Sequence, residues 1–148
     1  MSDNDFHPRF CDGSGFLSFR AGVMEKDHFV FVYGTLKRGQ SNHGWLCKSY
    51  FVKEARTAKK YLLYDLGPYP CLVAAPHGKG KHINGELYQV TESVLRGLDT
   101  LEGVGYGLYE RVRIKLLDTK EPVWGYLYLR DVSRLQEAGD SWSESEDK

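Results

Sequence analysis

The stretch FVFVYGTLKRGQSNH, Phe29–His43, indicates more about this chain than any other. It opens with a near-continuous apolar run from Val30 to Tyr33, which is typical of a strand buried on both faces. A glycine-containing turn follows directly, and its backbone N–H groups predict a cradle for an anionic or carbonyl ligand. We assign this cradle to Tyr33, Gly34, Thr35 and Leu36, with Gly34 expected to supply backbone freedom; the alternative is a plain hairpin-like turn.

The rest of the chain reads as mostly β structure. We expect further strands where β-branched and aromatic residues gather. They cover Phe51–Asp65, Cys71–Ala75, Ile83–Val90, Tyr109–Leu117 and Val123–Arg130. A short helix is expected from a cap at Ser41 or Asn42 to about Tyr50, and a longer one over Glu92–Leu101 with Thr91 as its N-cap. The pattern predicts an α+β fold with a small twisted mixed β-sheet or barrel and a few short helices.

The amino-acid composition limits the class of protein and the kinds of partner that can be expected. The 148 residues suffice for one domain, and 20 basic residues balance 20 acidic ones, so no global field favours nucleic acid or an anionic membrane. The three cysteines are scattered and signal neither a disulfide framework nor a zinc site. No apolar run is long enough for a membrane span. We expect a cytoplasmic monomer whose partner is a small molecule.

Two tails flank the expected domain at residues 28–130. Residues 1–27 show no sustained period and predict a flexible extension, although its phenylalanines could dock on the core. Residues 131–148 end in SWSESEDK, and this acidic stretch predicts a disordered tail.

One carboxylate stands out downstream, in LRGLDTLEG. Val94, Leu98 and Glu102 are spaced four apart, so a continuing helix places Glu102 on the buried stripe. Burial and the negative end of the helix dipole both raise the pKa of a carboxyl, which suits proton exchange near neutral pH. The alternative is a frayed helix end with Glu102 in solvent.

Other polar residues have weaker claims. Tyr126 and Tyr128 share one face of the last strand, where either could donate a hydroxyl to a substrate or pack in the core. Glu86 is the rival carboxylate, which we interpret as solvated or structural. The histidines at positions 43, 77 and 82 lack ligand spacing, so no metal site is expected.

In these motifs, together with GPYP at Gly67–Pro70, GELYQV at Gly85–Val90 and LYERVRI at Leu108–Ile114, the chain resembles the gamma-glutamylcyclotransferase-like (AIG2-like) family. Within it, the gamma-glutamylamine cyclotransferase branch is most similar. The resemblance implies that the YGTL backbone holds a glutamyl carboxylate, that Glu102 is the general acid/base, and that no cofactor is needed. It implies an enzyme that releases 5-oxoproline from a small gamma-glutamyl substrate; the alternative is a non-catalytic ligand-binding or regulatory module on the same fold.

Overall fold

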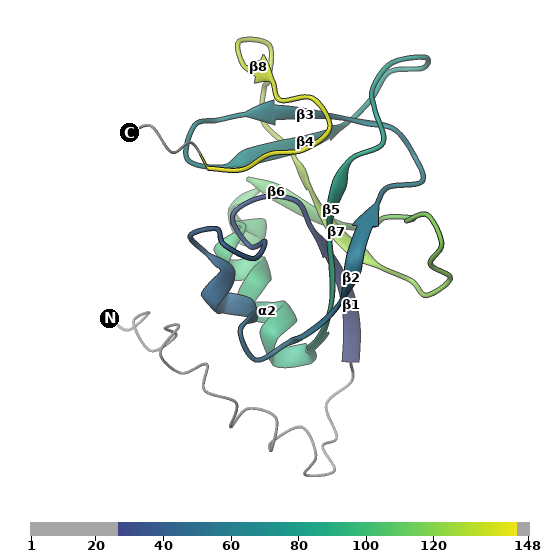
Figure 1. The fold of residues 1–148 in the computed structure, drawn as a ribbon. Helices are drawn as coiled ribbons and strands as arrows, with labels where there is room; N and C mark the ends of the chain where they lie inside the picture. The colour runs from purple at the N-terminus through teal and green to yellow at the C-terminus, as the bar shows by residue number, and fades with distance from the viewer. Residues whose placement is uncertain (1–26, 145–148) are drawn as a thin grey trace.

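The computed structural model describes residues 27–144 of the chain. Within these residues the fold consists of two sheets and one α-helix (Figure 1). The strands are β1 (Asp27–Val32), β2 (Tyr50–Arg56), β3 (Tyr61–Asp65), β4 (Pro70–Ala74), β5 (Asn84–Thr91), β6 (Tyr109–Arg113), β7 (Trp124–Tyr128) and β8 (Gln136–Glu137). The helices are α2 (Glu92–Leu101) and two short 3₁₀ helices, η3 (His43–Leu46) and η4 (Val104–Tyr106).

The larger sheet is mixed and has the strand order β2-β5-β1-β7-β6. The β1–β7 pair is parallel, and the other three pairs are antiparallel. The smaller sheet, β4-β3-β8, is antiparallel and lies across one end of the larger one, opposite α2 (Figure 1). The predicted α+β fold is confirmed, although Phe51–Asp65 forms two strands in different sheets instead of one.

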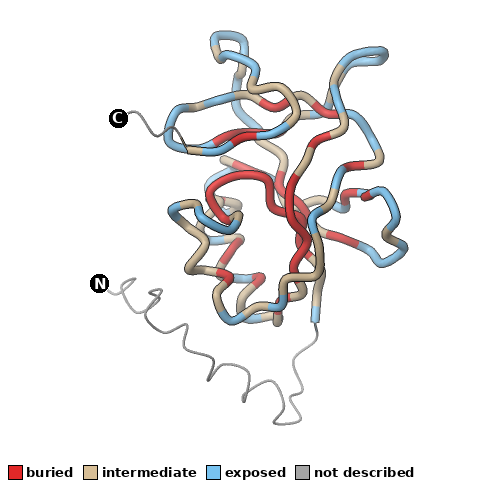
Figure 2. Tube along the Cα trace, in the orientation of Figure 1, coloured by how far each residue is buried: buried red, intermediate tan, exposed pale blue. Residues whose placement is uncertain are grey.

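Strand β1 separates two hydrophobic cores. Val30 and Val32 point into the core beneath α2, whereas Phe31 and Tyr33 point into the core shared with the smaller sheet. Alternate side chains of a strand face opposite ways, so a strand between two cores needs apolar residues at every position. Figure 2 shows this burial continuing from β1 into the turn that follows it.

Helix α2 has the predicted bounds. The Thr91 hydroxyl accepts a hydrogen bond from the Val94 N–H at 3.3 Å, as an N-cap should. Leu95 and Leu98 are buried against the core. Gly103, with a φ of 69°, ends the helix in the left-handed conformation, so Glu102 is the C-cap residue just after Leu101.

Two local expectations need correction. The predicted helix from residue 41 or 42 to about Tyr50 is only the 3₁₀ turn η3, and Asn42 caps it without a side-chain hydrogen bond. Cys47 is disulfide-bonded, whereas the scattered cysteines gave no sign of a disulfide.

No helix within residues 27–144 has the length and apolar character to cross a bilayer. The flexible extension predicted over residues 1–27 lies, but for Asp27 at the start of β1, outside the described residues.

The C-terminal prediction is wrong for residues 131–144. They add β8 to the smaller sheet and bury Trp142, whose side chain is 6% exposed. The Trp142 indole N–H donates to Asp65 at 3.0 Å, and the Ser41 N–H donates to Glu144 at 3.0 Å. This C-terminal segment, residues 131–144, therefore ties the end of β3 to the loop that follows the YGTL turn.

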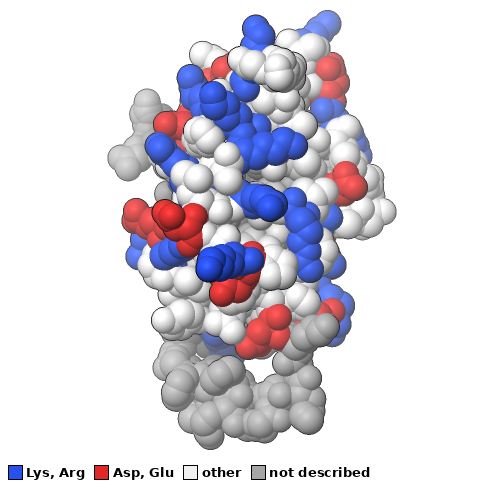
Figure 3. All heavy atoms as spheres, turned by 90° about the vertical axis from the view of Figure 1, so that its right-hand side faces the viewer, with Lys and Arg blue, Asp and Glu red and all other residues white. Residues whose placement is uncertain are grey.

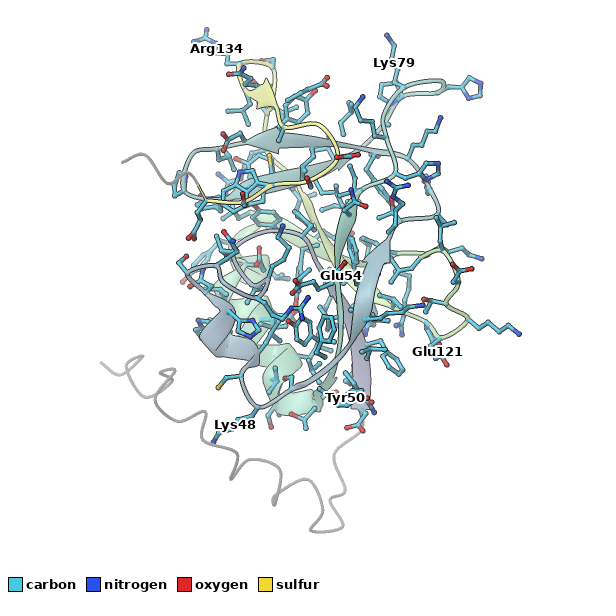
Figure 4. The ribbon with its side chains drawn as sticks, in the orientation of Figure 1. Lys48, Tyr50, Glu54, Lys79, Glu121 and Arg134 are labelled. Carbon is cyan, nitrogen blue, oxygen red and sulfur yellow. The ribbon has the colours of Figure 1, made fainter. Side chains whose placement is uncertain are left out.

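Charge is unevenly spread despite the zero total. Figure 3 shows a face on which Lys and Arg side chains predominate, with acidic side chains among them. Lys79 extends from the tip of the β4–β5 loop into solvent (Figure 4).

Candidate active site

A cavity of about 320 Å³ lies where the turn after β1, the β3–β4 turn and the end of α2 meet. That volume is at the lower end of the range for small-molecule sites. The lining residues are Phe31, Val32, Tyr33, Gly34, Thr35, Leu36, Ser41, Asn42, Pro68, Tyr69, Pro70, Leu101, Glu102, Leu108, Tyr109 and Tyr126. The structure thus brings the predicted cradle and the predicted base, almost seventy positions apart in sequence, to one cavity.

The cradle turn presents unused backbone donors. Within residues 27–144, no hydrogen bond uses the backbone N–H of Thr35 or Leu36. The opposite side of the turn is fixed, because the Thr35 carbonyl accepts from the Asn42 N–H at 2.8 Å and the Leu36 carbonyl contacts His43 Nδ1 at 2.9 Å. A rigid turn that lines a cavity and has free N–H groups suits an anionic or carbonyl ligand.

The reason for glycine at position 34 differs from the one expected. Gly34 does not adopt a left-handed φ, so backbone freedom is not what this position requires. A Cβ atom here would instead lie 2.6 Å from Cγ and Cδ of Pro70. Glycine is needed because β4 begins directly against the turn.

Glu86 is structural, the second of the two roles expected for it. Its carboxylate accepts from the Arg38 N–H at 2.9 Å and from the Tyr88 hydroxyl at 2.9 Å, and it is 9% exposed. Arg38 also pairs with Glu54 at 3.2 Å, the residue labelled on β2 in Figure 4. Glu86 does not line the cavity, and it holds the chain just beyond the YGTL turn.

Glu102 lies on the cavity wall at the end of α2. Its backbone N–H closes the last helical hydrogen bond, to the Leu98 carbonyl at 2.9 Å, so its position is fixed. Among residues 27–144, no side chain forms a hydrogen bond or ion pair with its carboxylate. Burial raises the pKa of Glu102 to about 7. A carboxyl with that pKa can accept and return a proton at neutral pH.

Three tyrosines surround Glu102. Burial, followed by the Glu102 charge, raises the pKa of Tyr33. The Tyr33 hydroxyl donates to the Tyr126 carbonyl at 2.8 Å, and the Tyr109 hydroxyl donates to the Pro70 carbonyl at 2.7 Å. Tyr126 was predicted. Tyr109 was missed, although its motif LYERVRI was noted, because no period distinguishes a cavity tyrosine from a core one.

Tyr128 is not at the cavity. Its ring packs edge-on against that of Tyr109, with centroids 5.2 Å apart, so the structure supports core packing, the alternative expected for it. The histidines likewise show no ligand cluster: within residues 27–144, no group of three or more His, Cys, Asp or Glu residues could hold a metal ion.

The family model described as "Gamma-glutamyl cyclotransferase, AIG2-like" matches residues 30–146. The chain belongs to this family. The match includes residues 131–144, so the C-terminal segment is part of the AIG2-like domain and not a tail outside it.

Individual relatives agree with the family assignment. The Vibrio cholerae relative named "Putative gamma-glutamylcyclotransferase" is 41% identical over 118 residues, which cover 77% of this chain and 92% of the relative. The human protein named gamma-glutamylaminecyclotransferase is 39% identical over 104 residues, 63% of this chain and 65% of its own. A crystal structure of an AIG2-like protein from mouse superposes with a TM-score of 0.64 at 29% identity, covering 78% of this chain and 88% of that one.

Proposed function

We propose that this protein is a gamma-glutamylamine cyclotransferase, which converts a gamma-glutamyl amide into 5-oxoproline and a free amine such as lysine. The observation that carries the proposal is one cavity with two kinds of group. Glu102, with a pKa of about 7, shares that cavity with the unused N–H groups of Thr35 and Leu36. A site that only binds the carboxylate of a ligand gains nothing from a protein carboxylate beside it. A proton-transfer reaction, in contrast, needs such a group.

In the proposed reaction, the N–H groups of the cradle hold the α-carboxylate of the gamma-glutamyl group. The α-ammonium, with a pKa of about 8, gives one proton to the Glu102 carboxylate. The freed amine attacks the γ-carbonyl carbon, forming the new C–N bond of the lactam. Glu102 then gives its proton to the leaving nitrogen as the old C–N bond breaks. The vacated Glu102 carboxylate takes the second proton from the new lactam nitrogen and passes it to the departing amine, which leaves as an ammonium.

Holding the reactive conformer is the main task left for the protein. Nucleophile and electrophile belong to the same molecule, and effective molarities of about 10⁵ to 10⁸ M show how much positioning can contribute. The rigid turn and the fixed end of α2 are suited to that task. The human relative's name supports an amine as the leaving group.

A panel of gamma-glutamyl compounds tests the proposal. Gamma-glutamyl-ε-lysine and gamma-glutamyl amino acids would be incubated with the full chain, and both 5-oxoproline and the released amine would be measured. We expect equal amounts of the two products, with the ε-lysine compound turned over fastest. Binding of 5-oxoproline without turnover of any compound would favour the non-catalytic module instead.

A further inference from the structure

Asp99 and Tyr126 form a hydrogen-bonded pair beside the proposed base. Asp99 precedes Glu102 by three positions on α2, so the two carboxylates are neighbours on one helix face. The Tyr126 hydroxyl, coming from β7, donates to Asp99 Oδ1 at 2.7 Å. Arg111 Nε lies 2.9 Å from the same oxygen. Of Asp99, Tyr126 and Arg111, only Tyr126 lines the cavity. Glu102 lines the same cavity.

This pair determines which hydrogen bonds the Tyr126 hydroxyl can donate and which it can accept. A hydroxyl has one proton to donate and two lone pairs to accept with. A carboxylate only accepts, and the Tyr126 hydroxyl donates to Asp99, which is also paired with Arg111, so the Tyr126 proton is committed to Asp99. Any further partner of the Tyr126 oxygen must therefore be a donor.

A donor with more than one N–H suits the space beside these groups. After burial and the contact with Asp99, the Glu102 charge further raises the pKa of Tyr126, so the Glu102 carboxylate and the Tyr126 hydroxyl are electrostatic neighbours. An ammonium group carries three donors, enough to reach both acceptors at once. The γ-amide and the α-carboxylate offer fewer donors or none.

We propose that the Tyr126 oxygen accepts a hydrogen bond from the α-ammonium of the substrate, and that Asp99 is the positioning residue that keeps Tyr126 in this role. The proposal rests on the proposed function for the identity of the substrate. After the ammonium has given one proton to Glu102, the hydrogen bond to Tyr126 holds a second N–H. The nitrogen lone pair is then left free to attack the γ-carbonyl carbon.

A double-mutant cycle tests whether Asp99 acts through Tyr126. Tyr126→Phe removes the acceptor, and in Asp99→Asn the amide can donate to the Tyr126 oxygen and occupy it. Each single variant should lower kcat/KM by about 10- to 100-fold, the typical effect of losing a charge-assisted hydrogen bond, mainly through a higher KM. Adding Asp99→Asn to Tyr126→Phe should then cost little more activity.

Stability separates this role from a merely structural one. Asp99→Asn should lower the melting temperature with either Tyr or Phe at position 126, because Arg111 loses its ion-pair partner in both. Tyr128→Phe is the matched control, since its ring lies on the same strand outside the cavity, and it should keep the parent's kinetics. Losses of kcat/KM that multiply in the double variant would overturn the role of Asp99.

Binding without turnover tests the ammonium contact independently of the reaction. L-glutamine and its analogue that lacks the α-amine, 4-carbamoylbutanoate, would be titrated into the full chain, and the ligand recovered and checked to be intact. The parent should prefer L-glutamine by about tenfold or more, and Tyr126→Phe should lose most of this preference. If the parent shows this preference but turns over no gamma-glutamyl compound, the proposed function fails and the ammonium contact stands. Equal binding of the two ligands by the parent would overturn the contact.

Discussion

Pro70 lies directly against Gly34, so closely that a Cβ at position 34 would fall 2.6 Å from two atoms of the proline ring. Pro70 is held in place in two ways. Its carbonyl accepts a hydrogen bond from the Tyr109 hydroxyl at 2.7 Å, and it is the first residue of β4. The two walls of the cavity are thus packed to contact at this point. The shape of the cradle depends on position 34 having no side chain.

The first prediction concerns this contact. Gly34→Ala should displace the YGTL turn and weaken binding of 5-oxoproline by about tenfold or more, while the protein still folds with a destabilisation of about 1 to 3 kcal/mol from overpacking. Isothermal titration and thermal melting measure the two effects. Gly105→Ala is the matched control, since nothing lies within 4 Å of that position and its φ is not left-handed. Unchanged binding by Gly34→Ala would mean that the turn does not hold the ligand.

The sequence predicts the elements whose signals are local. Helix α2 was assigned its bounds and its Thr91 cap because the cap and the stripe of Leu95 and Leu98 lie within one window. The two-sided burial of β1 likewise follows from its own residues. The position of Glu102 could be argued in the same way, since it continues the stripe by one turn.

What the sequence could not predict depends on single contacts between distant segments. Trp142 is one aromatic residue among polar ones, so no period marks it as part of a core. Its partner Asp65 lies 77 positions away. Gly34 was correctly singled out for the wrong reason, because the clash with Pro70 exists only once β4 is packed against the turn.

The second prediction concerns the C-terminal segment. Trp142→Ala should destabilise the protein by about 3 to 5 kcal/mol, as is usual for removing a buried Trp side chain. Trp142→Phe keeps an aromatic ring but loses the hydrogen bond to Asp65 and part of the buried indole volume, so it should cost about 1 to 3 kcal/mol. Urea unfolding measures both. If truncation after residue 130 left the unfolding midpoint unchanged, the packing of residues 131–144 would be irrelevant to stability.

The third prediction concerns the pH dependence of stability. Folding raises the pKa of Glu102 from 4.5 to about 7, so between these values the folded protein holds a proton that the unfolded chain has released. Stability attributable to Glu102 is therefore complete below about pH 4.5 and falls as the pH rises to about 7. At 1.36 kcal/mol per pKa unit, the loss is roughly 3 kcal/mol.

Glu102→Gln does not titrate, so comparison with the parent isolates this effect. The variant should become more stable than the parent as the pH rises from 5 to 8, and the difference should level off above about pH 8. Chemical unfolding of both proteins at matched pH values measures it. A stability difference that stays constant across this range would show that Glu102 titrates normally and is not desolvated.

The most direct test of the account is the rate of 5-oxoproline formation from gamma-glutamyl-ε-lysine by Glu102→Gln, compared with the parent under single-turnover conditions at neutral pH. Glu110→Gln is the matched control, because Glu110 is exposed on β6 and does not line the cavity. The account predicts a rate about 10² to 10⁴ times lower for Glu102→Gln, parent-like binding of 5-oxoproline, and a parent-like rate for the control. A Glu102→Gln protein that forms 5-oxoproline at nearly the parent's rate would contradict it.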